Sequence, residues 1–148
     1  MSVTLVQLAR AYTVFANDGQ LAPLSLIRLD STPPMVQVLS PQTARAMRKM
    51  LEMGVSDEGT APLARIAGYR VAGKTGTAYK IKNGQYVKDY VASFVGFAPV
   101  SDPRIVIAVM VDEPTGAYYG GQVAAPVFAQ IAGATLRTLQ VAPDGPLE

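Results

Sequence analysis

The chain has 148 residues, 49% hydrophobic and 16% charged, which suits one globular domain with a sizeable core and excludes a disordered segment. Histidine and cysteine are both absent, which excludes a Ser-His-Asp triad, a cysteine nucleophile, disulfides and metal sites built on imidazole or thiolate. The net charge is only +2, and few exposed aromatics accompany the basic cluster between Arg70 and Arg104, so we do not expect nucleic-acid binding.

The first helix is predicted from an N-terminal capping signal. Thr4 and Gln7 have the spacing of a capping box, and apolar residues follow at helical intervals until Asn17-Asp18-Gly19 ends the run. Residues 24–29 form a short apolar piece that we expect to be extended or connecting.

A second helix is predicted to begin at Ser40-Pro41, because serine is a good cap and proline suits the first helical position. It ends near Gly54. A polar loop over residues 56–60 and a short helix over residues 61–66 are expected to follow.

Three strands are predicted next, over residues 69–81, 90–99 and 104–112, with the Asn83-Gly84 pair marking a hairpin turn between the first two. The second and third strands are apolar on both alternating faces, so both faces of the sheet need cover. A last helix is expected over residues 123–139.

The expected fold class is therefore α+β, with an antiparallel sheet covered by helices on both faces. One domain portion is expected over residues 1–148, with a tail that frays from about residue 142. The longest strongly apolar run, Ile105 to Val111, is far too short to cross a bilayer.

One lysine is placed as if to meet a ligand. The stretch VAGKTGTAYK, residues 71–80, sets Lys74 between glycines and threonines on the first predicted strand. No carboxylate close in sequence neutralises it, although an exposed lysine on an edge strand is the simpler alternative. With histidine and cysteine absent, proton transfer in any acyl-transfer chemistry would run through Lys, Tyr, Asp or Glu, and Lys74 is the natural candidate.

Four segments of the chain together resemble a known family. The segments SVTLVQLARAYTVFANDGQ, VAGKTGTA, GFAPVSDPRIVIAVMVDEP and YYGGQVAAPVF closely resemble the C-terminal part of class B penicillin-binding proteins, between Ser2 and about Pro143. These are the D,D-transpeptidases that cross-link peptidoglycan at the division septum of Gram-negative bacteria. The resemblance implies the transpeptidase fold shared with serine β-lactamases, incomplete here because the N-terminal part of the domain is missing.

The family's chemistry rests on three motifs, Ser-x-x-Lys, Ser-x-Asn and Lys-Thr-Gly. Only the third is present, since no serine of the chain begins either of the others. We therefore expect a fragment that lacks the nucleophilic serine and is inactive by itself.

The resemblance implies roles for particular residues. Lys74 and Thr77 would be catalytic, with the Lys74 ammonium near the serine and the Thr77 N–H in the oxyanion hole, where one donor is worth about 3–4 kcal/mol. The hydroxyls of Thr75 and Thr77 would bind the terminal carboxylate of the substrate. Gly76 would leave room for substrate beside the strand.

The family's loop around Tyr118, Tyr119 and Gly120 has aromatics that wall the active site, so these three residues are expected to bind substrate. For Tyr119, an alternative is that its ring only caps the core. Tyr79 departs from the family, where a basic residue often stands, and Lys80 is a possible substitute for it. Asp112-Glu113 is interpreted as part of a turn.

The implied ligands are peptidoglycan stem peptides and β-lactams, without a cofactor or a metal. Divisome proteins would be partners of the parent protein at the periplasmic face of the inner membrane. Two alternatives stay open, a fragment of a serine β-lactamase or β-lactam sensor, and a non-catalytic divisome interaction module. Loss of neighbouring strands would leave the edge at residues 104–112 free for self-association.

Overall fold

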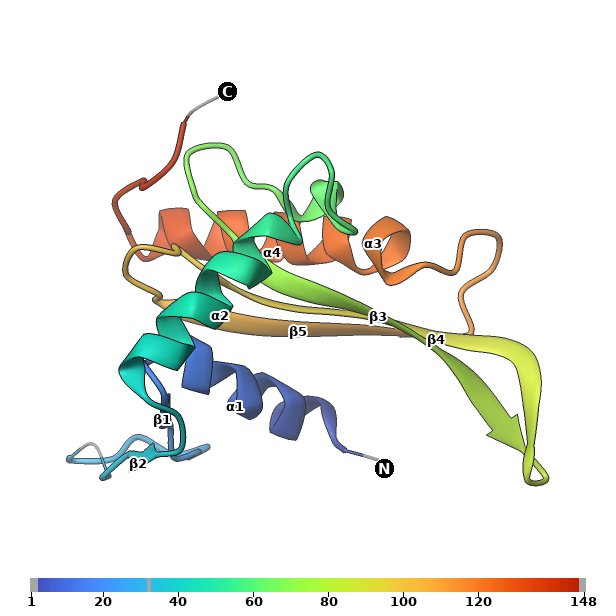
Figure 1. Cartoon of the computed structure of the whole chain (residues 1–148), viewed down its shortest axis with the longest axis horizontal. Helices are drawn as coiled ribbons and strands as arrows, with labels where there is room; N and C mark the ends of the chain where they lie inside the picture. Colours follow the sequence, from blue (N-terminus) through green and yellow to red (C-terminus); the bar gives the residue numbers. More distant parts are fainter. Residues whose placement is uncertain (1–2, 32, 147–148) are drawn as a thin grey trace.

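The computed structural model describes residues 3–31 and 33–146, which form layers of helices on both sides of a sheet (Figure 1). The sheet consists of β3 (Ala72–Lys82), β4 (Gln85–Ala98) and β5 (Ile105–Asp112), all antiparallel and in the order β3-β4-β5. The three expected strands and their meander are therefore confirmed. No helix within the described residues is long and apolar enough to traverse a membrane.

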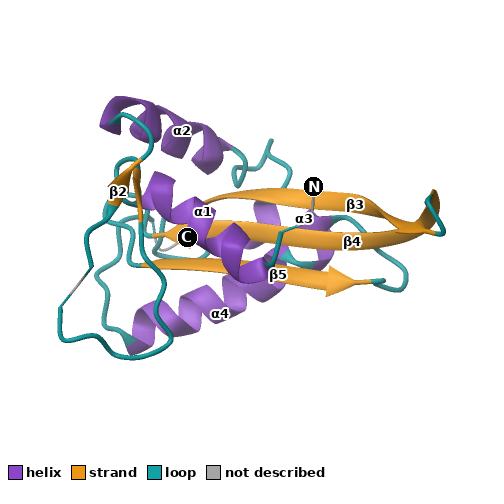
Figure 2. Ribbon diagram, turned by 90° about the horizontal axis from the view of Figure 1, so that it is seen from below, coloured by secondary structure: helices purple, strands orange, loops and turns teal. Residues whose placement is uncertain are grey.

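Helices cover both faces of this sheet, as the doubly apolar strands require (Figures 1 and 2). On one face lie α3 (Gly120–Val123) and α4 (Ala125–Thr138), and α1 (Leu5–Ala16) crosses the other. The remaining long helix, α2 (Pro41–Met53), packs beside the start of β3. The predicted α+β class is thus confirmed.

Two phenylalanines of β4 show that the strand packs side chains on both faces of the sheet. Phe94 packs on Phe128 of α4 with ring centroids 4.8 Å apart, and both side chains are fully buried. Phe97 points to the opposite face and packs with Leu51 of α2. Because side chains alternate along a strand, residues at odd separation enter opposite layers, and each buried ring contributes about 1.5–3 kcal/mol.

The two predicted helix starts are confirmed by their caps. Thr4 Oγ1 accepts a 3.2 Å hydrogen bond from the Gln7 N–H, and Gln7 Oε1 accepts one of 2.8 Å from the Thr4 N–H. Ser40 Oγ accepts a 3.1 Å bond from the Thr43 N–H at the start of α2. Each such cap is worth about 1 kcal/mol of helix stability.

The turn between β3 and β4 is also as expected. Asn83 and Gly84 both have positive φ, 53° and 77°, which is the backbone twist that a two-residue hairpin turn requires. The strand limits differ from the expectation, because β3 begins at Ala72 and β4 begins at Gln85. Tyr69 lies instead in a turn closed by its N–H to the Ile66 carbonyl, and its hydroxyl donates to the Val141 carbonyl.

Local patterning was inaccurate at two other places. The short helix expected over residues 61–66 is only a 3-10 turn, Pro62–Ala64, whereas the expected last helix is confirmed as α4, with the short α3 before it. Residues 24–29 form a connection without regular structure, as expected, but the two-residue strands β1 (Gln20–Leu21) and β2 (Val36–Gln37) that pair around them were not predicted. Two-residue strands leave no periodicity to detect.

Hydrogen bonds attach the tail as far as it is described, and its fraying from about residue 142 stays a prediction. The Pro146 carbonyl accepts a 2.7 Å bond from the Gly68 N–H. The Asp144 carboxylate accepts bonds of 2.8 Å from the Arg70 N–H and 3.0 Å from the Ser101 N–H. These bonds attach residues up to 146 to the start of β3. Residues 147–148, also expected to fray, lie outside the described residues.

Candidate active site

The Lys-Thr-Gly stretch lies where β3 emerges from the core. Ala72 and Gly73 are buried, whereas Lys74, Thr77 and Ala78 are exposed. Among the described residues, β3 pairs only with β4, so its other edge is free along this stretch. A free strand edge offers backbone donors and acceptors to an extended peptide.

The Lys74 ammonium interacts with threonines and not with carboxylates. It donates to Thr75 Oγ1 at 3.1 Å and to the Thr75 carbonyl at 3.4 Å, and Thr75 Oγ1 donates in turn to Thr60 Oγ1 at 3.2 Å. Lys74 takes part in none of the ion pairs formed within residues 3–31 and 33–146. Its charge is thus available to an anionic ligand. Thr60 was missed by the sequence analysis because it lies in a polar loop without a motif.

Thr77 is joined to the start of α3. The Gly120 N–H donates a 3.1 Å hydrogen bond to Thr77 Oγ1. A Cβ at position 120 would lie 2.2 Å from the Ser93 carbonyl oxygen and 2.7 Å from the Gly76 carbonyl oxygen, so only glycine fits. The structure therefore brings Gly120 directly against β3 and β4.

The space beside Gly76 is occupied by its neighbour across the sheet. A Cβ at Gly76 would lie 2.5 Å from Ser93 Oγ, which donates a 3.5 Å bond to the Gly76 carbonyl. Ser93 is the strand partner of Gly76 and lies on the same face. The expectation that Gly76 makes room for substrate stays a prediction, beside this packing reason that the sequence analysis missed.

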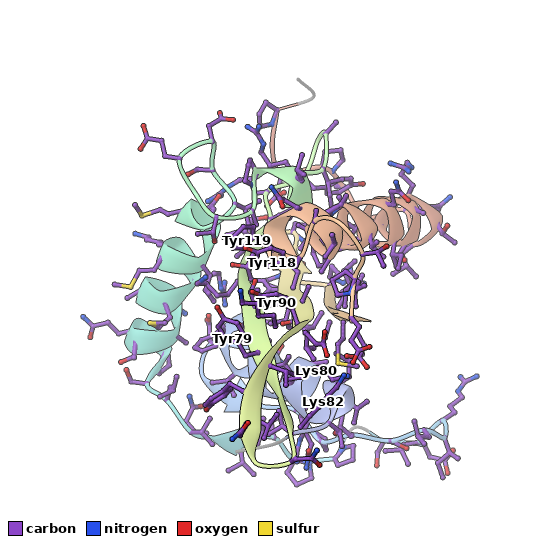
Figure 3. The ribbon with its side chains drawn as sticks, turned by 90° about the vertical axis from the view of Figure 1, so that its right-hand side faces the viewer. Tyr79, Lys80, Lys82, Tyr90, Tyr118 and Tyr119 are labelled. Atoms are coloured by element: carbon purple, nitrogen blue, oxygen red, sulfur yellow. The ribbon has the colours of Figure 1, made fainter. Side chains whose placement is uncertain are left out.

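Four aromatic rings continue the site toward the hairpin, and we call Tyr79, Tyr90, Tyr118 and Tyr119 the tyrosine ladder (Figure 3). Tyr118 stacks on Tyr90 with centroids 4.2 Å apart, Tyr90 contacts Tyr79 at 4.9 Å, and Tyr119 contacts Tyr118 at 4.5 Å. Tyr79 and Tyr119 are 56% and 54% exposed. Tyr119 therefore forms part of an open aromatic surface and does not cap the core.

Two rings of the ladder, those of Tyr90 and Tyr118, have raised pKa values. The hydrogen bond with Tyr79 is the main reason that the pKa of Tyr90 is raised to about 12. The pKa of Tyr118 is raised chiefly by its hydrogen bond with Tyr119, whose hydroxyl lies 3.3 Å away. Tyr90 and Tyr118 therefore keep their protons near neutral pH, and their pair of rings is neutral.

Lys80 does not replace the basic residue that the family often carries at position 79. Its ammonium pairs with Asp112 Oδ1 and with Glu113 Oε1, both at 2.9 Å, and these hydrogen bonds raise the pKa of Lys80. By strand alternation Lys80 also faces away from Tyr79. Asp112 and Glu113 thus serve as partners of lysines at the end of β5, in agreement with their interpretation as structural residues.

Comparison with known proteins gives a consistent result. Residues 1–133 match the family described as the penicillin binding protein transpeptidase domain. The chain is 48% identical over 146 residues to a protein of Pseudomonas aeruginosa named probable peptidoglycan D,D-transpeptidase PbpC. It is 40% identical over 146 residues to the peptidoglycan D,D-transpeptidase FtsI of Escherichia coli. Each alignment covers 97% of this chain but only 26% and 25% of the relative, so the chain spans about a quarter of their length.

A solved structure of a related protein also has a similar fold. The transpeptidase domain of penicillin-binding protein 3 from Burkholderia pseudomallei superposes with a TM-score of 0.89 at 54% sequence identity. The match covers 97% of this chain and 45% of that chain.

Proposed function

The chain belongs to the penicillin-binding protein transpeptidase family, and we propose that it supplies the Lys-Thr-Gly side of the active site of a peptidoglycan D,D-transpeptidase. The observation that carries this proposal is the free edge of β3, where Lys74 has no carboxylate partner among the described residues and Thr77 is bonded to Gly120. Relatives named FtsI and PenA favour the septal type of enzyme.

The proposed reaction is acyl transfer through a serine that this chain does not supply in a Ser-x-x-Lys motif. The serine oxygen attacks the penultimate D-alanyl carbonyl of a stem peptide, the peptide bond to the terminal D-alanine breaks, and that D-alanine leaves with a proton. An amine of a second stem peptide then attacks the ester, loses its proton and releases the serine. The outcome is one new cross-link.

In this reaction Lys74 is assigned two tasks. Its ammonium stands near the serine, where it assists proton transfer, and it attracts the carboxylate at the end of the stem peptide. An ammonium without a carboxylate partner suits both tasks, because its field is not neutralised in advance. The N–H of Thr77 is assigned to the oxyanion hole, worth about 3–4 kcal/mol.

The hydroxyls of Thr75 and Thr77 differ in whether their hydrogen is free to be donated to the carboxylate. Thr77 Oγ1 accepts from the Gly120 N–H, so its own hydrogen remains to be donated. Thr75 Oγ1 already donates to Thr60 Oγ1. Binding through Thr75 therefore requires its hydroxyl to turn away from Thr60, and Thr77 is the readier donor of the pair.

The ligands assigned to this site are stem peptides and β-lactams, and the tyrosine ladder with Gly120 forms one wall of it. The enzyme is assigned to the periplasmic face of the inner membrane, with divisome proteins as partners. The relatives bear transpeptidase names, which disfavours a β-lactamase or sensor. No specific observation favours a purely structural divisome module.

Acylation by a fluorescent penicillin tests this function, with the chain expressed together with its upstream coding sequence. Lys74→Met should slow acylation by about 100-fold or more, the usual contribution of a general acid–base group. Lys49→Met, at an exposed position of α2 outside the Lys-Thr-Gly stretch and the tyrosine ladder, removes an equal charge and should have no effect. Unchanged acylation of the Lys74 variant would refute the assignment.

The isolated chain provides a second test. Incubated with excess benzylpenicillin, it should gain no mass, because the nucleophile is assigned elsewhere. A stable penicilloyl adduct would place a nucleophile within these residues and contradict the proposal.

A further inference from the structure

The tyrosine ladder is assembled from three separate segments. Tyr79 lies on β3, Tyr90 on β4, and Tyr118 and Tyr119 lie on the loop between β5 and α3. Sheet pairing aligns Tyr79 with Tyr90, but it does not extend to the loop. The Gly120 N–H bond to Thr77 Oγ1 attaches the C-terminal end of this loop to β3, so it is the N-terminal end of the loop that needs a second attachment.

Packing alone does not fix the hairpin end of the ladder either. The register of β3 and β4 shifts just after Tyr79, where Lys88 and Asp89 are inserted as a bulge. A hollow of about 280 Å³ opens there, lined by Tyr79, Tyr86, Val87 and Lys88. Tyr79 thus has open space on one side and needs support from elsewhere.

A group of charged side chains connects the strands and the loop that carry the ladder. We call Lys80, Lys82, Asp89, Asp112 and Glu113 the charge junction (Figure 3 labels its two lysines). Lys80 pairs with Asp112 and Glu113, and Lys82 pairs with Asp89 at 2.5 Å and with Glu113 at 3.2 Å.

The junction adjoins the ladder in sequence on both strands and includes a residue near the start of the loop. Lys80 directly follows Tyr79, Asp89 directly precedes Tyr90, and Glu113 begins the loop that carries Tyr118. The backbone thus links the junction to each segment of the ladder.

Glu113 is the centre of this junction. Its carboxylate accepts from both lysines, and its backbone N–H donates a 2.9 Å bond to the Tyr90 carbonyl. Its φ is +48°, a left-handed conformation that a residue with a side chain keeps only when its surroundings hold it there. One residue thus connects β3, β4 and the loop.

We propose that Glu113 is a positioning residue that holds the tyrosine ladder in register beside Thr77, so that the ladder presents one continuous wall to the ligand. That the ladder faces a ligand rests on the function proposed above, whereas the positioning of the rings is a property of this chain. Exposed ion pairs contribute little to global stability, so the effect should appear in the placement of the rings and only weakly in the melting temperature.

Near-ultraviolet circular dichroism of the chain tests the proposal, because the sequence contains no tryptophan and seven tyrosines dominate the signal. Glu113→Gln removes the charge at nearly constant shape and should abolish most of the tyrosine band while the far-ultraviolet spectrum is unchanged. Asp57→Asn breaks the exposed pair of Asp57 with Arg65, away from the ladder, and should leave the band intact.

Ring contacts provide a direct readout in the same samples. Nuclear Overhauser effects between the rings of Tyr90 and Tyr118 should be present in the wild type and lost in Glu113→Gln. Retention of both the band and these effects in a folded Glu113→Gln protein would overturn the proposal.

Two more variants separate the carboxylate from the backbone. Glu113→Gly suits the positive φ but lacks the carboxylate, so the ladder should loosen as it does in Glu113→Gln; an intact ladder would overturn the proposal. Lys80→Met removes one of the two lysines that pair with Glu113 and should weaken the tyrosine band partially. If Glu113→Gln does not fold, an unchanged band in Lys80→Met overturns the proposal. Because these measurements use no substrate, their failure is distinct from failure of the proposed reaction.

Discussion

Thr77 and Gly120 are joined by a 3.1 Å hydrogen bond from the Gly120 N–H to Thr77 Oγ1, across 43 residues of sequence. The bond connects the proposed catalytic strand to the segment that begins α3. It also occupies one lone pair of the hydroxyl while leaving its hydrogen free, so one contact serves the architecture and the proposed ligand site together.

Replacing Thr77 by valine should affect stability and activity at once. The variant keeps the shape but leaves the partly buried Gly120 N–H without its acceptor, which costs about 1–3 kcal/mol. Urea unfolding measures this loss. Penicillin acylation should also fall, since a hydroxyl donor to the carboxylate is gone, whereas Thr77→Ser should retain both properties. Equal stability of the valine and serine variants would contradict this account of the bond.

Two glycines of the site should respond differently to alanine. Gly120→Ala places a Cβ 2.2 Å from the Ser93 carbonyl oxygen, a backbone atom that cannot turn away, and should cost about 1–3 kcal/mol or more. In Gly76→Ala the close atom is Ser93 Oγ, which can rotate, so the loss should be smaller. Thermal and urea unfolding compare the two. A larger loss at Gly76 would show that the strands adjust more easily than the geometry implies.

Stability should depend on Asp18 in acid. Its pKa is lowered from the ordinary value of 3.8, chiefly by the hydrogen bond from Arg45 and also by the charges of Arg45 and Arg48. A carboxyl whose pKa is depressed by folding stabilises the fold above the unfolded pKa, and this contribution is lost as the pH falls through the folded pKa. Urea unfolding should therefore show a loss of stability in the wild type that begins as the pH approaches about 4 and continues below it.

The matched variant for this effect is Asp18→Asn, because asparagine tolerates the positive φ of 47° at this position. Its stability should be lower near neutral pH and should change less in acid. Parallel pH profiles of the two proteins would exclude Asp18 as a source of the acid sensitivity.

The edge of β5 should promote self-association of the chain. Among the described residues β5 pairs only with β4, and Met110 on it is 53% exposed. Light scattering at micromolar concentration should detect oligomers, and Met110→Lys should reduce them, because a charged edge residue opposes strand pairing. Met53→Lys, at a 69% exposed position of α2, is the control. A monodisperse wild-type chain would contradict this prediction.

Much of the fold was predictable from local chemistry. The capping box at Thr4, the Ser40-Pro41 start and the Asn83-Gly84 turn each depend on residues within one turn of each other, and all three are confirmed. The strands that are apolar on both faces likewise required helices on both sides of the sheet. What failed were features without local signals, such as the pairing of Gln20–Leu21 with Val36–Gln37.

The candidate site was only half visible in the sequence. Lys74 and its threonines form a motif, but Thr60, Ser93 and Tyr90 do not, because their contacts depend on strand register and on loops that return from elsewhere in the chain. Only strand pairing could have suggested Tyr90 as the neighbour of Tyr79.

The sequence by itself determined the helix starts, the hairpin, the two-faced strands and the family to which the Lys-Thr-Gly stretch belongs, because short-range backbone chemistry and side-chain patterning encode them. The tertiary structure alone decided that Gly120 bonds to Thr77, that four tyrosine rings contact one another in a row, and that Glu113 pairs with two lysines. These contacts connect residues far apart in the chain, and their geometry depends on how the loop between β5 and α3 returns to the sheet.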